Sequence, residues 1–411
     1  MDVRWTVGPR ASHAGWVIDT VRSGPGATPT AAAPASVSVA PLRIGPLEVS
    51  PPVVLAPMAG ITNTAFRRIC RDHGAGLFVS EMVTARGLVE DSDKSWARAA
   101  FGPDETPRSI QLYGSDPRSM GEAVRRLTTE GHVDHIDINL GCPVRKITRH
   151  GGGAALTARP GLLAALLGAA VDNAGAVPVT VKFRIGIDDS LPTYLDAGRV
   201  AEEAGCAAVA LHGRTAAQLY SGTADWSAIA TLKQAVTTIP VLGNGDIWKG
   251  TDAVRMMRET GCDGVVIGRG CLGRPWLFGD LADAFAGRAP AAPPPLGEVL
   301  DTMARHSALL VDHLGEQRAL LDFRKHVTWY LTGYPAGSAA RKILHDAGSL
   351  TDFHRALAEL DRMIVPIPGA VDLPRGTHRG PQTVTLPDRW LADRDSLVPP
   401  GALADVGVSG G

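Results

Sequence analysis

The stretch DINLGCP, residues 137–143, carries the clearest structural signal in the chain. It ends an apolar–polar alternation that begins at His135, which predicts a strand, and the Gly-Cys-Pro turn predicts a tight bend that presents the thiol of Cys142. Catalytic groups of parallel-strand barrels lie at the carboxyl ends of the strands. The alternative is a small cysteine that fills the core, because free cysteines are among the most buried residues. The other strands decide between the two.

Short apolar segments recur along the chain and give eight predicted strands. They span Val53–Met58, Leu77–Met82, Arg108–Tyr113, His135–Leu140, Val179–Arg184, Ala208–His212, Pro240–Asn244 and Gly264–Gly268. Eight strands that alternate with helices over ~220 residues predict an α/β fold of the (β/α)8 TIM barrel type. A doubly wound sheet is the structural rival, but it usually has a Gly-x-Gly-x-x-Gly turn after its first strand, where this chain reads APMAG at 56–60.

Amphipathic helical patterns separate most of these strands. The predicted helices span Thr62–His73, Asp116–Glu130, Leu162–Val171, Thr193–Ala204, Trp226–Val236 and Thr251–Thr260. Thr62 is expected to cap the first of them, because its hydroxyl can accept a hydrogen bond from the first helical turn. The connection between the second and third strands is the least helical.

The composition changes along the chain and divides it into five parts. Residues 1–41 form an Ala/Pro/Ser/Gly-rich leader that is expected to be disordered. Residues 42–288 hold the barrel, and 289–295 form an Ala/Pro linker. Apolar residues at helical spacing predict a small helical bundle over 296–365. Pro, Gly and single charges dominate residues 366–411, which predicts a loosely ordered tail.

The overall composition excludes several classes of protein. The formal net charge of -1 means that any nucleic-acid contact must come from local basic patches. The five cysteines are odd in number and lack a Cys-x-x-Cys pair, which argues against a disulfide framework and for the cytoplasm. No apolar run reaches the length of about 20 residues that a membrane span needs. No His/Asp/Glu spacing indicates a metal site, and a monomer is expected.

Polar or special residues close nearly every predicted strand. In chain order they are Pro57, Met58, Ala59, Glu81, Gln111, Asn139, Cys142, Lys182, Arg184, His212, Arg214, Asn244, Gly245, Asp246, Gly268, Arg269 and Gly270. Alternation places Lys182 on the face that it shares with Thr180 and Arg184, inside the barrel. A buried lysine is paired in a salt bridge, forms a Schiff base, or faces a cofactor that becomes anionic.

Two glycine-rich turns favour the cofactor. GNGD at 243–246 and GRG at 268–270 follow the last two strands, where many barrels bind a phosphate. Glycine lets the backbone approach the phosphate oxygens, and Arg269 can pair with them in a bidentate manner.

Together these motifs resemble those of the bacterial tRNA-dihydrouridine synthases, flavin enzymes that reduce uridine in tRNA. The resemblance covers Leu42 to Met363 and rests on APMAGIT (56–62), QLYG (111–114), NLGCP (139–143), VKFR (181–184), HGRT (212–215), GNGD (243–246) and GRG (268–270), in the order of the family. The Trp329-Tyr330 pair after Arg324-Lys325-His326 resembles the B-type branch.

The resemblance implies FMN as the cofactor and NADPH as the reductant. It places Pro57, Met58 and Ala59 along the flavin, Gln111 and Lys182 at its ring system, His212 as a residue that helps hold it, and Asn244, Gly245, Asp246, Gly268 and Arg269 around its tail and phosphate. Cys142 takes the position of the proton donor, and Asn139 orients the base, with Arg184 as a further substrate contact. The expected partner is tRNA, reduced at uridines of its D-loop.

The helical bundle is expected to hold the tRNA. Its basic candidates are Arg324, Lys325, His326, Arg341, Lys342, Arg355 and Arg362, of which the first two are taken as substrate-binding. A mobile loop over the site is expected at Arg145, Lys146 and Arg149, before the glycines at 151–153.

Three rival functions stay open at the level of sequence. A flavin barrel of the dihydroorotate dehydrogenase type would explain the cofactor residues but not the C-terminal bundle. A Schiff-base aldolase would use Lys182 as its nucleophile. A tRNA-binding protein with an inactive barrel would keep the bundle and lose the reduction.

Overall fold

The computed structural model describes residues 40–130, 133–376 and 380–400. The leader predicted for residues 1–41 therefore lies almost entirely outside the described residues. Among the helices in these ranges, none combines the length and the apolar character needed to cross a membrane.

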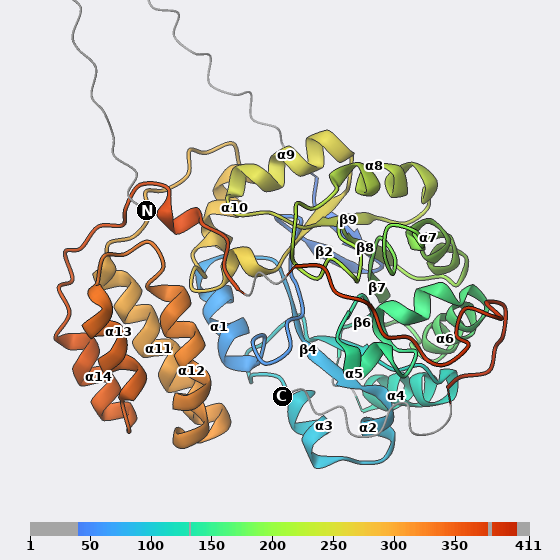
Figure 1. Ribbon diagram of the computed structural model, residues 1–411, viewed down its shortest axis with the longest axis horizontal. Helices are drawn as coiled ribbons and strands as arrows, with labels where there is room; N and C mark the ends of the chain where they lie inside the picture. Colours follow the sequence, from blue (N-terminus) through green and yellow to red (C-terminus); the bar gives the residue numbers. More distant parts are fainter. Residues whose placement is uncertain (1–39, 131–132, 377–379, 401–411) are drawn as a thin grey trace, which may run out of the picture. The chain divides into compact units, whose positions relative to one another are not determined.

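Eight parallel strands close into a barrel, which confirms the predicted (β/α)8 TIM fold (Figure 1). The strands are β3 (Val53–Leu55), β4 (Leu77–Thr84), β5 (Ser109–Tyr113), β6 (His135–Leu140), β7 (Val179–Arg184), β8 (Ala208–His212), β9 (Val241–Asn244) and β10 (Gly264–Ile267). Closure comes from β10, which pairs in parallel with β9 on one side and with β3 on the other. Each predicted strand is present, and the ends differ by three residues at most.

Helices surround the barrel on the outside (Figure 1). They are α1 (Thr64–His73), α2 (Ala85–Val89), α3 (Asp93–Arg98), α4 (Pro117–Thr129), α5 (Arg145–Thr148), α6 (Pro160–Asp172), α7 (Tyr194–Glu203), α8 (Trp226–Ala235), α9 (Gly250–Thr260) and α10 (Leu277–Phe285), with the short 3-10 helices η1 (Gly153–Ala158) and η2 (Arg269–Cys271). The prediction that Thr62 caps the first helix is wrong. Asn63 caps it, accepting from the Phe66 N–H at 3.1 Å, because the Thr62 hydroxyl is bonded to the backbone of Met58.

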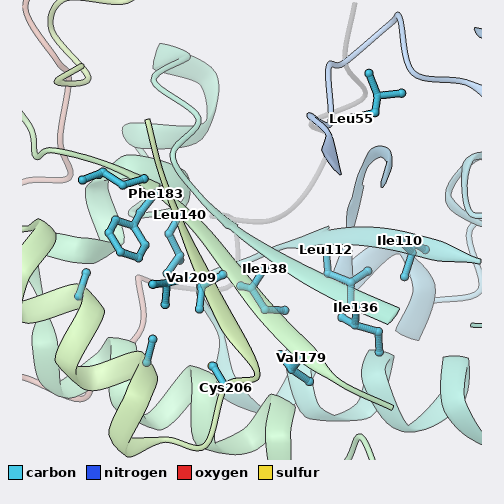
Figure 2. Close-up of a cluster of buried hydrophobic side chains, with 14 of the residues drawn as sticks. Leu55, Ile110, Leu112, Ile136, Ile138, Leu140, Val179, Phe183, Cys206 and Val209 are labelled. Atoms are coloured by element: carbon cyan, nitrogen blue, oxygen red, sulfur yellow. The ribbon is translucent and has the colours of Figure 1, made fainter. Parts of the chain in front are cut away.

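The alternation along the strands turns an apolar face outward and a mixed face inward, where Val54, Leu242 and Val266 lie beside Asp137 and Thr180. In β6, Ile136, Ile138 and Leu140 point outward into the main hydrophobic core between strands and helices (Figure 2). The residues between them, His135, Asp137 and Asn139, face the barrel interior and are joined there by hydrogen bonds. Burial of the outer face stabilises the fold, so the inner face is free to carry polar chemistry.

A small antiparallel hairpin, β1 (Leu42–Ile44) and β2 (Leu47–Val49), covers the amino-terminal end of the barrel. Its buried side chains Leu42, Ile44 and Val49 pack against inward-facing residues of the strands. The hairpin thus closes the end of the barrel opposite to the strand termini that carry polar residues, and leaves the carboxyl-terminal mouth as the open end.

Four helices form a bundle beside α1 (Figure 1). They are α11 (Leu296–Leu314), α12 (Glu316–Tyr330), α13 (Gly337–Asp346) and α14 (Leu350–Ala358), which share a second hydrophobic core. The bundle contacts the barrel through α11 against α1, and through Lys325, whose ammonium donates to the carbonyl of Gly60 at 2.6 Å.

The tail that composition predicts to be loosely ordered makes specific contacts over its described part. A 3-10 turn, η3 (Ala370–Asp372), is held by Arg274, which donates to the carbonyl of Val371 at 2.8 Å. Farther along, Trp390 is only 3% exposed and belongs to the main core. Tertiary contacts with the barrel therefore order a segment whose own composition does not.

A buried ion pair fixes α1 to the chain that enters β5. The side chains of Arg67 and Glu105 are 1% and 3% exposed, and the guanidinium also donates to the carbonyl of Thr62 at 2.7 Å. Removal of one partner leaves the other charge buried and unpaired, which costs far more than the pair itself contributes.

Glu105→Ala should therefore lower the free energy of unfolding by about 3–5 kcal/mol. Urea denaturation followed by circular dichroism measures this loss. The control is Asp301→Ala, which removes a 66% exposed partner of Arg362 and should cost less than about 1 kcal/mol. Similar losses in the two variants would contradict the assignment.

Candidate active site

A cavity of about 570 Å³ opens at the carboxyl-terminal mouth of the barrel, and all eight strands or the turns after them contribute to its wall. This size lies within the range of ordinary ligand sites. The sequence-predicted residues that line it are Pro57, Met58, Ala59, Gln111, Asn139, Cys142, Lys182, Arg184, His212, Asn244, Gly245, Asp246, Gly268 and Arg269. Residues up to 212 positions apart in the chain are thus brought together by the barrel alone.

Arg324 and Lys325 lie elsewhere. Arg324 donates to the carbonyl of His345 at 3.0 Å, within the bundle. Lys325 bonds the carbonyl of Gly60 and the carboxylate of Asp322, both at 2.6 Å. Neither side chain lines the cavity, and Lys325 connects the bundle to the barrel through its hydrogen bond to Gly60.

The backbone at Cys142 is held by the side chain of Asn139. The Oδ1 atom of Asn139 accepts from the N–H groups of Gly141 at 3.1 Å and Cys142 at 2.9 Å. Arg184 supports the same turn, since its Nε donates to the carbonyl of Gly141 at 2.9 Å. The thiol is therefore fixed at the cavity wall by two neighbouring strands.

Asn139 is in turn the end of a hydrogen-bonded series that runs down the barrel interior. Its Nδ2 donates to Gln111 at 2.8 Å, and Gln111 donates to Asp137 at 2.7 Å. Thr180 donates to the second oxygen of Asp137 at 2.7 Å, so the Nε2 atom of His135 must be the donor to Thr180. Each amide of the series is locked in one orientation, and with it the turn at Cys142.

The thiol of Cys142 is protonated at neutral pH. Burial raises its pKa above the usual value, and the nearby charge of Arg184 opposes this only in part. A protonated thiol is a proton donor, whereas nucleophilic cysteines have a lowered pKa. The geometry thus favours acid chemistry at this position.

Lys182 and His212 face the cavity with unusual protonation behaviour. Burial, followed by the charge of Arg184, lowers the pKa of Lys182 to about 7, while Asp137 opposes the shift. Burial and several surrounding cations hold the pKa of His212 well below its usual range. The imidazole of His212 is accordingly neutral. The pKa of Lys182 lies close to neutral pH, so a nearby negative charge would favour its protonated form.

Another part of the cavity wall is formed by Arg269 and its neighbours. Its Nη1 atom is buried and has no hydrogen-bond partner among the described residues. The guanidinium lies 4.6 Å from the ring centroid of Tyr220 and 5.4 Å from that of Trp248. A buried, unpartnered donor of this kind is costly unless a ligand accepts from it, and guanidinium groups favour phosphate.

The turn after β9 has two fixed features. Both carboxylate oxygens of Asp246 accept from Arg214 at 2.8 Å, so Asp246 shapes the turn and does not present a free charge. Gly245 has a φ of +129°, and a Cβ there would lie 2.5 Å from the Cβ of Ala224. Only glycine fits at this point, which keeps the backbone open toward the cavity.

Sequence reasoning missed three aromatic residues of the cavity wall as site residues: Tyr220, Trp248 and Trp329. The first two lie in loops that have no hydrophobic period. Trp329 belongs to α12 and reaches the cavity only through the packing of the bundle. In the sequence, Trp329 stands out only through the Trp329-Tyr330 pair that resembles the B-type branch.

Comparison with known proteins places the chain among relatives. A family model described as dihydrouridine synthase (Dus) matches residues 54–364, which is most of the chain. The chain belongs to the Dus family. The motifs around the cavity, from the turn after β3 to the loop after β10, all lie inside the matched region, so the resemblance seen in the sequence is confirmed.

Individual relatives agree with this assignment. A "Probable tRNA-dihydrouridine synthase" of Mycobacterium leprae is 52% identical, over 87% of this chain and 100% of its own length. One of Mycobacterium tuberculosis is 54% identical, over 88% and 94%. A "tRNA-dihydrouridine synthase B" of Pseudomonas aeruginosa is 42% identical, over 70% and 86%. The last of these agrees with the expected B-type branch.

Lys182→Met should raise the melting temperature of the protein at pH 6.5, because it removes a buried ammonium whose folded pKa is about 7. Between that value and the ordinary 10.5, the unfolded chain binds a proton that the folded chain does not. Wild-type stability therefore increases with pH in this window, and the advantage of the variant should shrink by pH 9.5.

Differential scanning calorimetry at the two pH values, without added cofactor, measures this effect. Lys342→Met is the control, because Lys342 is 77% exposed in a surface ion pair. A gain for Lys182→Met that does not change with pH would contradict a buried ammonium.

Proposed function

We propose that this protein reduces the C5–C6 bond of uridines in the D-loop of tRNA to 5,6-dihydrouridine, with FMN as its cofactor and NADPH as its reductant. Membership of the Dus family and the names of its relatives support the reaction. The observation that carries the proposal is a protonated cysteine, fixed on one wall of a cavity whose other walls hold Lys182, Arg184 and Arg269.

The cavity has the features that FMN requires. Its size suits a flavin mononucleotide, and the unpartnered Nη1 of Arg269 would donate to the phosphate. Gly245 and Gly268 also line the cavity and would let the backbone approach the phosphate. Gln111 and Lys182 would hold the ring system, while Pro57, Met58 and Ala59 would line it.

The reaction needs a proton and a place for negative charge. When bound and reduced, FMN supplies a hydride to C6 of a uracil ring. Cys142 holds the proton that C5 then requires, at Sγ. Lys182 and Arg184 also line the cavity, and the charge of Arg184, with that of Lys182 when it is protonated, would favour the negative charge that develops before the proton arrives. Asn139 is the proposed contact that orients the base, because it lines the cavity and accepts from the N–H of Cys142.

The bundle is the proposed tRNA-binding surface. Several of its basic side chains are exposed, among them Lys342 at 77%, Arg355 at 64% and Arg362 at 50%. Because the whole chain is nearly neutral, contact with phosphates would depend on such local groups. The target uridine must leave its stack to enter the barrel mouth, which costs roughly a few kcal/mol. A monomer in the cytoplasm suits this role.

Mapping of dihydrouridine by mass spectrometry, in tRNA from a strain that lacks this gene, tests the proposal. One D-loop position should lose the modification, and purified protein with FMN should restore it in an NADPH-dependent manner. Rapid turnover of free dihydroorotate with no effect on tRNA would instead support a small-molecule flavin barrel. Protein that is colourless and takes up no FMN would refute the proposal.

Cys142→Ala should retain FMN and its reduction by NADPH, and lose uridine reduction by about 10²–10⁴-fold, because general acid catalysis contributes that much. Single-turnover assays with unmodified tRNA measure the loss. Cys206→Ala, which changes a buried thiol of the main core, is the matched control. Full activity of Cys142→Ala would refute the role of the thiol as proton donor.

Arg269→Ala should weaken FMN binding by about 10- to 100-fold, because a charge-assisted hydrogen bond contributes ~1.5–3 kcal/mol. Flavin content after dialysis and fluorescence titration report the change. Arg258→Ala alters an exposed side chain on α9 and should bind FMN normally. An unchanged dissociation constant for Arg269→Ala would contradict the phosphate assignment.

A further inference from the structure

Residues 380–400, here called the strap, run along the barrel past α6 (Figure 1). The strap contacts the loop after β8, where the N–H of Gln382 donates to the carbonyl of Ala217 at 2.8 Å. It then reaches the loop after β6, which contains η1. The family match ends at residue 364, so the strap lies outside the part of the chain that family membership explains.

Trp390 is the main contact of the strap with η1. Its Nε1 donates to the carbonyl of Ala155 at 2.9 Å, and its own carbonyl accepts from Nε of Arg159 at 3.0 Å. The guanidinium of Arg159 also lies over the indole ring, 4.2 Å from the centroid. Arg394 adds a further bond, to the carbonyl of Ala158 at 2.9 Å. These donors satisfy carbonyls of a short helix that has few partners of its own.

The other side of η1 touches Cys142. The N–H of Ala154 donates to the carbonyl of Cys142 at 3.1 Å. A Cβ on Gly153 would lie 2.5 Å from that carbonyl oxygen and 3.1 Å from the Cβ of Cys142, so the two backbones are in direct contact. Ala154 and Ala155 are adjacent, so these two residues connect the indole of Trp390 to the backbone of Cys142.

The loop is held partly by its own contacts, because Leu156 and Ala158 of η1 belong to the main core and the Thr157 hydroxyl lies 2.7 Å from that of Thr193. Its start is the costly part. Three consecutive glycines, residues 151–153, precede η1, and glycine loses more conformational freedom on folding than any other residue. The indole ring packs against the first of them, because a Cβ on Gly151 would lie 2.6 Å from Cη2 of Trp390. The strap thus adds contacts at the point of the loop where ordering the backbone costs most.

We propose that the strap positions Cys142 for proton transfer, with Trp390 as the positioning residue that holds η1 against the backbone of the cysteine. This inference rests on the proposed function of Cys142 as the proton donor. Trp390 does not line the cavity; it acts through Ala155 and Ala154. A displacement of about 1 Å at the reacting group is enough to slow an enzyme about 100-fold, so a loosened loop has a large kinetic effect.

The test compares Trp390→Ala and Trp390→Phe with the wild-type protein. Leu391→Ala is the control, because Leu391 is the next residue in the strap and is 43% exposed. Three properties are measured: FMN content with its rate of reduction by NADPH, the single-turnover rate of uridine reduction, and the rate at which iodoacetamide alkylates Cys142, followed by peptide mass spectrometry.

Trp390→Ala should keep FMN and its reduction rate, lose uridine reduction by about 10- to 100-fold, and show at least about tenfold faster alkylation of Cys142. Trp390→Phe keeps a ring but lacks the Nε1 donor, so its loss should be smaller. Leu391→Ala should behave as wild type. A wild-type rate of uridine reduction in Trp390→Ala, or unchanged alkylation, would overturn the proposal.

If Trp390→Ala does not fold, the same measurements on Trp390→Phe decide, and unchanged values there overturn the proposal. Alkylation also separates the two levels of inference. A wild-type protein that forms no dihydrouridine would end the proposed function. Faster alkylation of Cys142 in the variants would still show whether the strap holds that loop, because this readout needs neither tRNA nor turnover.

Discussion

Closure of the sheet through the pairing of β10 with β3 is the constraint on which the rest of the structure depends. Val265 lies opposite Val53 and Ile267 opposite Leu55, so the last strand meets the first in register. Because all eight strands are parallel, closure brings every carboxyl end to one mouth. Residues as distant in the chain as Pro57 and Arg269 therefore line the same cavity without any dedicated contact between them.

Inside the closed barrel, burial of polar groups costs free energy, and the hydrogen-bonded series from Asp137 to Asn139 both reduces this cost and holds the site residues in place. Burial raises the pKa of Asp137 and lowers the pKa of His135 to about 3, which shows how unfavourable charge is there. Donation by Gln111 and Thr180 to the carboxylate offsets part of this cost. A fully satisfied network of this kind is rigid, and its rigidity passes through Asn139 to the turn at Cys142.

The strands, the polar mouth and the order of the site residues could be predicted from sequence, because they follow from alternation and from strand ends. Other features could not. The strands of the hairpin β1–β2 are too short to show an apolar–polar pattern in the sequence. The N-cap of α1 is Asn63 and not Thr62, because the Thr62 hydroxyl is hydrogen-bonded to the backbone of Met58. Trp390 is ordered by Ala155, which lies 235 residues away in the chain. Composition alone predicts a loosely ordered tail, because it does not contain the tertiary contacts that Trp390 makes with the barrel.

The charges around the barrel mouth favour anions, a preference that the nearly neutral chain as a whole does not have. The formal net charge is -1, yet four cations surround His212: burial lowers the pKa of its imidazole, and the charges of Arg184, Lys182, Arg214 and Arg269 lower it further. The carboxylate of Asp246 accepts from Arg214 at 2.8 Å and lies 3.7 Å from Arg269, so one carboxylate faces several cations. Cations gathered in a concave, poorly solvated mouth attract anions far more strongly than the same charges on an open surface. The mouth of the barrel therefore suits an anionic group, although the chain as a whole is nearly neutral.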